Sequence, residues 1–172
     1  ARSEMCIRDS HDGVALVRFH RELDEKVADG SINQETEWSI AERLEEIRAE
    51  HSEYRGLSFA TIAGYAGNGA IVHYEATAED HAQLANKSFL LLDSGAHYVS
   101  GTTDITRTIP LGVLSDEEKK AYTLVLKGMI QLSMAHFPAG TTGLALDFAA
   151  RQSMWREGYD LSLIHISERA GK

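Results

Sequence analysis

The sequence predicts an α+β fold, in which helices are segregated from a mostly antiparallel sheet. Residues 12–28 and 37–50 carry apolar side chains at helical spacing. From residue 57 to residue 109 the pattern changes to short segments that are rich in β-branched and aromatic residues and separated by glycine, asparagine or serine. Helical spacing returns after residue 115. Because helices and strands occupy separate stretches of the chain, this order favours α+β over an alternating α/β arrangement.

Four helices are expected. The first covers residues 12–28, and its apolar stripe consists of Leu16, Phe19, Leu23 and Val27. Thr36 is a candidate N-cap for the second helix, residues 37–50, whose Glu and Arg side chains we interpret as a solvent-exposed face. A capping box at residues 115–118 opens the third helix, which extends to about residue 135. The fourth covers about residues 144–157.

Five strands are expected in the middle of the chain. They cover residues 57–63, 70–74, 88–93, 97–99 and 103–109. Successive side chains of a strand point to opposite faces of its sheet. In the last strand this alternation places Asp104, Thr106 and Thr108 on one face. Ile105, Arg107 and Ile109 then lie on the other face.

The two ends of the chain differ from the rest. Residues 1–10 read ARSEMCIRDS and residues 161–170 read LSLIHISERA, and one stretch of DNA read on its two strands can encode both. This inverted repeat resembles the mosaic-end adapter of transposon-based library preparation. We therefore expect residues 1–10 and 161–172 to be adapter-derived. Residues 11–160 would then be a natural segment that is truncated on both sides.

Composition argues against several classes of protein. Cys6 is the only cysteine and lies in the first expected adapter tract, so the natural part has no disulfide and no Cys-based zinc site. This fits a reducing compartment such as the cytoplasm. The formal net charge of −9 argues against non-specific binding to nucleic acid or to an anionic membrane. No apolar run approaches the ~20 residues that are needed to span a bilayer.

The segment LLLDSGAHYVSGTTDITRT, residues 90–108, carries the strongest functional signal. An apolar strand ends at Asp93, and a hairpin or adjacent-strand pairing would bring Asp104 close to it. Two neighbouring buried carboxylates repel each other and lose hydration, so a proton, a basic partner or a cation must compensate. Carboxylate pairs bridge two divalent metals in hydrolytic sites. Alternatively, Asp93 only begins a turn and Asp104 only pairs with Arg107.

The segment GYAGNGAIVHYEAT, residues 64–77, carries a second signal. Its three glycines and one asparagine indicate tight turns or a close approach of the backbone. It lacks the Gly-Lys-Ser/Thr ending of a phosphate-binding loop. His73 follows two apolar residues and is expected in a strand beside the core, as either a packed, hydrogen-bonded residue or a functional one. No Gly-x-Ser-x-Gly motif is present, so a serine nucleophile has no support.

Two motifs carry a family resemblance. LSFATIAGYAGNGAIVHYEAT, residues 57–77, and the segment at 90–108 resemble the aminopeptidase P family, the Xaa-Pro aminopeptidases of the pita-bread metallopeptidase superfamily. The GTTDITRT form is similar to the long, multidomain branch, and the resemblance covers residues 11–160. It implies the N-terminal half of a pita-bread (creatinase/aminopeptidase-like) catalytic domain, with helices packed on the sheet. Half of such a sheet is expected to expose an unpaired edge and an apolar face.

The resemblance also implies a dinuclear metal site. Asp93 and Asp104 match two of its carboxylate ligands, and Asp104 would bridge two divalent ions, usually manganese and sometimes zinc or cobalt. A metal-bound hydroxide would attack the carbonyl before proline. His73 matches a catalytic histidine that helps to hold the substrate. Strand alternation places Thr106 where its hydroxyl could orient Asp104.

The remaining ligands of the family, one histidine and two glutamates, would follow residue 160. His165 is not that histidine, because it lies in the second expected adapter tract. With two of five protein ligands, this chain alone is expected to be inactive. The full-length parent would act on peptides with proline at the second position, possess no nucleic-acid or membrane partner, and could form a homodimer.

Two alternatives belong to other functional classes. A non-catalytic pita-bread protein-binding module is disfavoured by the retention of Asp93 and Asp104. A creatinase-type amidinohydrolase is disfavoured as well, because that line replaces these carboxylates.

Overall fold

The computed structural model describes residues 2–159, with side chains from Arg8 onward, and the chain divides into two compact units, residues 1–113 and 114–172. The helices of the first unit are α1 (Arg2–Asp29), η1 (Ser31–Gln34), α2 (Glu37–Ala49) and η2 (Ala66–Ala70). Its strands are β1 (Tyr54–Leu57), β2 (Ile62–Tyr65), β3 (Phe89–Ser94), β4 (Ala96–Tyr98), β5 (Gly101–Thr102) and β6 (Ile105–Pro110). The helices of the second unit are α3 (Asp116–Ser133) and α4 (Gly143–Trp155). The second expected adapter tract, residues 161–172, lies outside the described residues.

The two long helices of the first unit form where the apolar spacing predicted them. α1 begins at Arg2, so the expected start at residue 12 was wrong; residues 2–10 contain no proline or glycine that would stop a helix. The expected N-cap of α2 is confirmed. Thr36 Oγ1 accepts a hydrogen bond from the Ser39 N–H at 3.0 Å, and Ser39 Oγ accepts one from the Thr36 N–H at 2.9 Å. This reciprocal pair satisfies donors that a helix start otherwise leaves unpaired.

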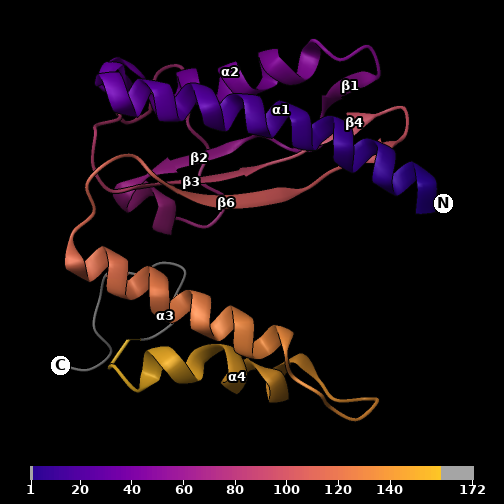
Figure 1. The fold of residues 1–172 in the computed structure, drawn as a ribbon, viewed down its shortest axis with the longest axis vertical. Coiled ribbons are helices and arrows are strands. Elements are labelled where there is room, and N and C mark those ends of the chain that lie inside the picture. Colours follow the sequence, from indigo (N-terminus) through magenta and orange to yellow (C-terminus); the bar gives the residue numbers. More distant parts are fainter. Residues whose placement is uncertain (1, 160–172) are drawn as a thin grey trace. The chain divides into compact units, whose positions relative to one another are not determined.

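A three-stranded antiparallel sheet with the order β2–β3–β6 forms the centre of the first unit. Along β3, Leu90 and Leu92 are buried, whereas Leu91 and Asp93 on the other face are half-buried. α1 and α2 cover the face that carries Leu90 and Leu92 (Figure 1). The core between these layers consists mainly of Leu16, Phe19, Leu23, Ile40, Leu44, Ile47, Ala63, Tyr65, Leu90, Leu92 and Ile109. Each large apolar side chain buried there stabilises the fold by about 1.5–3 kcal/mol.

β3 to β6 form one long antiparallel hairpin that ends in a two-residue turn. The same register joins Phe89 to Pro110 at the open end and Tyr98 to Gly101 beside the turn. The strand pairing is interrupted at Gly95 and at Thr103 and Asp104, so β3 and β6 belong to one sheet and β4 and β5 to a second sheet with the order β1–β4–β5. The hairpin that the sequence suggested between the two carboxylates is therefore confirmed.

Two of the expected strands are wrong. The expected strand at 57–63 is broken, because β1 pairs with β4 whereas β2 pairs with β3, and residues 58–61 cross from one pairing to the other. The expected strand at 70–74 is instead the end of η2 and the loop after it. A Cβ on Gly64 would lie 2.8 Å from the Gly69 Cα, so η2 packs directly on β2 through two glycines. The segment therefore covers the sheet instead of adding a strand to it.

The second unit is a pair of helices whose bounds lie within about two residues of the expected ones. The capping box of α3 is confirmed, because Ser115 Oγ accepts from the Glu118 N–H at 3.2 Å and Glu118 Oε2 accepts from the Ser115 N–H at 2.8 Å. Among the residues of this unit up to Tyr159, the buried side chains are Leu124, Met154 and Tyr159. They pack α3 against α4 and the residues that follow it.

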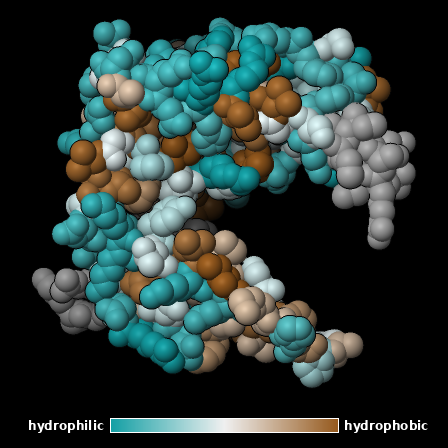
Figure 2. Space-filling model, viewed as in Figure 1, coloured by the Kyte–Doolittle hydropathy of each residue, from teal (hydrophilic) through white to brown (hydrophobic). Residues whose placement is uncertain are grey.

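Large apolar side chains are exposed along the second unit, which shows as brown patches in Figure 2. On the helices these are Tyr122, Val125, Leu126, Met129, Ile130, Leu132, Leu144, Phe148 and Trp155. Such an extended exposed stripe is typical of a surface that another element covers. The apolar face expected from the sequence was one of the sheet, whereas this stripe lies on the helices of the second unit, so that expectation stays a prediction. Within the described residues, no helix is long and apolar enough to span a membrane.

Candidate functional site

Asp93 lies in the middle strand of the sheet, on the face away from α1 and α2. It opposes Ile62 of β2 and Thr106 of β6, so the alternative that it only begins a turn is wrong. Its Oδ1 atom is buried and has no hydrogen-bond partner among the described residues. A buried carboxylate oxygen without a partner is costly and therefore rare in folded proteins. We expect a proton or a cation to compensate it.

Asp104 immediately precedes β6 and lies across the hairpin from Gly95. Because Asp93 opposes Thr106, continued strand alternation would place Asp104, two residues before Thr106, on the same face as Asp93 and diagonal to it. Such positions lie about 7–8 Å apart, a span that two cations held between carboxylates can fill. Asp104 is exposed, whereas Asp93 is half-buried. The register of the hairpin thus favours a common location for the two carboxylates that the sequence suggested as metal ligands.

The alternative role of Asp104 as an ion-pair partner of Arg107 is wrong. The Arg107 guanidinium donates to the Thr106 carbonyl at 2.8 Å, and the described residues give it no acidic partner. Thr106 is exposed, and its hydroxyl makes no hydrogen bond to Asp104 in the described part of the chain. Its suggested role in orienting Asp104 therefore stays a prediction.

His73 lies in the loop after η2, so the expected position in a strand is wrong. Its φ is +56°, in the left-handed region that few residues other than glycine adopt. The side chain is exposed and makes no hydrogen bond to any described residue. The alternative of a packed, hydrogen-bonded histidine is therefore wrong, and the imidazole is available to a ligand.

The segment that carries His73 lies on the same side of the sheet as Asp93. A Cβ on Gly69 would lie 3.3 Å from the Leu91 Cβ, and Leu91 shares its face of β3 with Asp93. In Figure 1, η2 accordingly lies on the side of the sheet away from α1. The histidine segment therefore packs on the face of the sheet that carries Asp93.

Sequence reasoning missed Glu37, which it assigned to a solvent-exposed face. The residue is fully buried in the first turn of α2. Its carboxylate accepts hydrogen bonds from the Tyr65 and Ala82 N–H groups, the Asn68 amide and the Tyr74 hydroxyl. No pattern in the sequence could have indicated this, because a glutamate next to an N-cap is favoured on any exposed helix.

The two carboxylates fit part of a divalent-cation site. Hard oxygen ligands suit ions such as Mn²⁺ and Zn²⁺, and the unpartnered Asp93 Oδ1 is a suitable position for one. No third His, Cys, Asp or Glu joins them within residues 2–159. The described residues thus supply at most two ligands, and His165, which was not expected to be one, lies outside them.

Gly95 fixes the bend of the hairpin beside this site. A Cβ at this position would lie 2.2 Å from both Ser58 Oγ and the Thr103 carbonyl oxygen. We expect Gly95→Ala to force the two arms apart and to weaken cation binding by roughly tenfold or more, as misplaced metal ligands do. Gly67→Ala, at a position with open space around it, is the matched control. Equal Mn²⁺ affinities of the two variants in a calorimetric titration of the full-length protein would contradict this.

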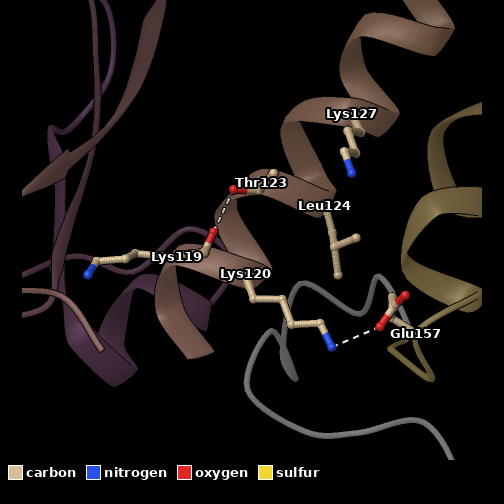
Figure 3. Close-up of a pocket in the computed structure, with 6 residues that line it drawn as sticks. All are labelled: Lys119, Lys120, Thr123, Leu124, Lys127 and Glu157. Carbon is tan, nitrogen blue, oxygen red and sulfur yellow. Dashed lines mark hydrogen bonds and ion pairs between the residues drawn. The ribbon is translucent and has the colours of Figure 1, made fainter. Parts of the chain in front are cut away.

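Surface grooves exist beside and away from this site. Asp104 lines one of about 530 Å³ together with residues of α1 and the β5–β6 connection. Another lies in the second unit, where Lys120 Nζ forms an ion pair with Glu157 at 2.8 Å (Figure 3). Its remaining lining residues are Lys119, Thr123, Leu124 and Lys127. Because none of the candidate residues lines this second groove, we place the functional site on the first unit.

Comparison with known proteins identifies the family of this chain. A model of metallopeptidase family M24 matches residues 9–168. A relative named "Probable Xaa-Pro aminopeptidase P" from Metarhizium robertsii is 49% identical over 149 residues, which cover 87% of this chain and 24% of that protein. One of the same name from Laccaria bicolor is 44% identical over 155 residues, covering 89% and 24%. The chain thus spans about a quarter of the length of these curated relatives.

Solved structures give the same result. An X-prolyl aminopeptidase from Caenorhabditis elegans, described as a cytosolic enzyme with a di-nuclear active site, has a TM-score of 0.81 and 34% identity, covering 94% of this chain and 26% of that one. An X-Pro aminopeptidase from Thermotoga maritima has a TM-score of 0.71 and 28% identity, covering 92% and 42%. These likenesses confirm the expected α+β, pita-bread class. Because the family model covers more than nine-tenths of the sequence, the chain belongs to metallopeptidase family M24.

Proposed function

We propose that the full-length protein carrying this segment is a metal-dependent Xaa-Pro aminopeptidase, which removes an N-terminal residue that precedes proline. The observation that carries this proposal is the buried, unpartnered Oδ1 of Asp93, on a hairpin that also presents Asp104. A structural carboxylate in a sheet would be paired with a donor or a cationic side chain. A buried oxygen left free on a face shared with a second carboxylate is instead typical of a cation ligand.

The residues of this chain would hold the cations and the substrate. Asp93 and Asp104 would be ligands of the divalent ions, and the Thr106 hydroxyl would orient Asp104. Bound cations would polarise the carbonyl that precedes proline and activate water. His73, with a free imidazole on the same side of the sheet, would hold the substrate at that carbonyl.

The finer assignments follow the family resemblance. Manganese is the expected ion, with zinc or cobalt as substitutes, and the substrates are peptides with proline at the second position. We place the enzyme in the cytoplasm, with no nucleic-acid or membrane partner, and propose that the full-length protein forms a homodimer. Residues 11–160 alone, with two of the five expected ligands, are proposed to be inactive.

An assay of the full-length protein on Xaa-Pro peptides tests this proposal. We expect cleavage to be lost on treatment with a chelator and restored by Mn²⁺, whereas peptides without proline at the second position are not cleaved. The 172-residue chain should cleave none of them. If the full-length protein binds no Mn²⁺ and cleaves no Xaa-Pro peptide, the proposal is wrong, and the alternative of a non-catalytic protein-binding module is favoured.

The role of His73 gives a separate prediction. Asparagine tolerates the left-handed conformation at this position, so His73→Asn removes the imidazole without straining the loop. We expect kcat/KM for a Xaa-Pro peptide to fall by roughly 10²-fold or more, as for the loss of a group that stabilises the transition state. Metal content, measured by atomic emission, is expected to stay unchanged.

His81→Asn in the same loop is the matched control for this variant. Its ring nitrogen contacts only the Thr77 carbonyl among the described residues, at 2.7 Å. We expect it to retain activity. Similar kcat/KM values for the two variants would show that His73 has no special role.

A further inference from the structure

Glu37 links the helix layer to the loop that carries His73. It is the first residue of α2 and is 0% exposed. Its Oε1 accepts a hydrogen bond from the Tyr65 N–H at 2.6 Å, and its Oε2 accepts one from the Ala82 N–H at 2.7 Å. Tyr65 ends β2 and Ala82 lies beyond the loop, so a single carboxylate holds both ends of residues 66–81.

Two side chains inside this segment bind the same carboxylate. The Tyr74 hydroxyl donates to Glu37 Oε2 at 2.6 Å, and Asn68 Nδ2 donates to Oε1 at 3.0 Å. The Asn68 amide also donates to the Tyr74 hydroxyl oxygen at 3.0 Å. Burial raises the pKa of Tyr74 to about 12, and its hydrogen bond to Glu37 adds to that effect, so the phenol keeps its proton at neutral pH. The four donor groups together occupy the lone-pair positions that a carboxylate offers.

The backbone of His73 needs this support. Its φ of +56° is disfavoured for a residue with a side chain and persists only where surrounding contacts fix it. Because the imidazole makes no hydrogen bond to a described residue, its position depends on the backbone on either side. Tyr74, the next residue, is hydrogen-bonded to Glu37. The Glu37 carboxylate is therefore the contact that fixes the backbone next to His73.

We propose that Glu37 is a positioning residue that holds His73 in place on the Asp93 side of the sheet. This inference rests on the proposed peptidase function. Since β2 is an edge strand, the segment passes around the outer edge of the sheet, and Glu37 secures it at that edge. Misplacing a reacting or binding group by about 1 Å can lower a rate by 10²-fold. Release of this loop would misplace His73 and is therefore expected to lower the rate of cleavage.

The test compares variants of the full-length protein on a Xaa-Pro peptide. Glu37→Gln replaces one carboxylate oxygen by an NH2 group. This group faces a hydrogen-bond donor of the loop and cannot accept its hydrogen bond. We expect this substitution to lower kcat/KM by roughly 10²-fold. The double variant Glu37→Gln/His73→Asn is expected to have the same kcat/KM as His73→Asn alone. Both changes remove the contribution of the His73 imidazole, so their effects do not multiply. Ser39→Ala removes part of the cap of the same helix without touching the loop, and its activity is expected to be unchanged.

A milder variant covers the case in which Glu37→Gln does not fold. Tyr74→Phe keeps the ring and removes only the hydroxyl that binds Glu37. We expect kcat/KM to fall by roughly 3–10-fold, the effect of one hydrogen bond. This loss is again expected to disappear in the His73→Asn background. Losses that multiply in either double variant, or full activity in both single variants, would overturn the proposal.

The nuclear magnetic resonance signal of the His73 ring gives a readout that is independent of turnover. In the metal-free full-length protein with labelled histidine, we expect Glu37→Gln and Tyr74→Phe to shift or broaden this signal and Ser39→Ala to leave it in place. If the wild-type protein cleaves no Xaa-Pro peptide, the proposed function fails, and this comparison alone decides the positioning role. An unperturbed signal in both loop variants then overturns it.

Discussion

Asp93→Asn in the full-length protein is expected to abolish measurable cleavage of Xaa-Pro peptides, with a loss in kcat/KM of roughly 10³-fold or more. The amide offers one weaker acceptor and a donor that repels a cation. A metal site contributes several kcal/mol to the transition state, and each 1.4 kcal/mol is about a factor of ten in rate. Steady-state kinetics and calorimetric titration with Mn²⁺ measure the two effects together.

When no metal is present, the same substitution is expected to stabilise the protein, although it abolishes activity. In the metal-free protein, the buried Oδ1 of Asp93 lacks a partner within residues 2–159, so removing its charge is expected to raise the unfolding temperature. Saturating Mn²⁺ should stabilise the wild type, by ~2.7 kcal/mol at 100 times the dissociation constant, and not the variant. Asp24→Asn on the exposed face of α1 is the control and is expected to change neither quantity. A metal-free variant less stable than wild type would show that Asp93 has a structural role.

Arg48→Met is expected to destabilise the protein by about 3–5 kcal/mol, because it leaves a buried aspartate without its partner. Arg48 Nε and Nη2 donate to the two oxygens of Asp12 at 2.7 and 3.0 Å, which joins α2 to α1. The side chains are 0% and 4% exposed. Tyr98 also donates to Asp12 Oδ1 at 3.1 Å, so the network reaches β4. Urea unfolding of the full-length protein measures the change in free energy.

A second ion pair between the same two helices provides the control for this prediction. Arg43 binds Glu22 through two hydrogen bonds of 2.8 Å, but both side chains are about one-third exposed. Solvent screens such a pair, so Arg43→Met is expected to cost ~1 kcal/mol or less. Equal costs for the two variants would show that burial does not govern the strength of the Asp12–Arg48 pair.

The sequence predicted those parts of the molecule that depend on local chemistry. Helical spacing located α2 and the helices of the second unit, and the hydroxyl at Thr36 located a cap. The apolar run before Asp93 located β3, and the short spacing to Asp104 indicated the hairpin. These features follow from residues that are close in the chain, so their patterns are visible without tertiary contacts.

The features that were missed depend on residues that are far apart. The stretch at 57–63 has strand composition throughout, but its first residue belongs to β1, which pairs with β4, and its last residues belong to β2, which pairs with β3. No local pattern reveals this change of partner. His73 follows a β-like sequence and nevertheless lies in a loop, because η2 packs against β2 through glycines. Glu37 and Arg48 occur among the many charged residues of α2, and only their distant partners explain why they are buried.

The register that the β3–β6 and β4–β5 pairings share determines where homologous sequences can differ in length. Residues added at its two-residue turn lengthen the tip and leave the alignment of Asp93 with Thr106 unchanged. A single residue inserted on one arm beside Gly95 would move every later side chain to the opposite face. That slip would turn Asp104 away from Asp93. Insertions and deletions at the tip of the hairpin are therefore compatible with the proposed metal site, whereas the spacing along each arm has to be kept.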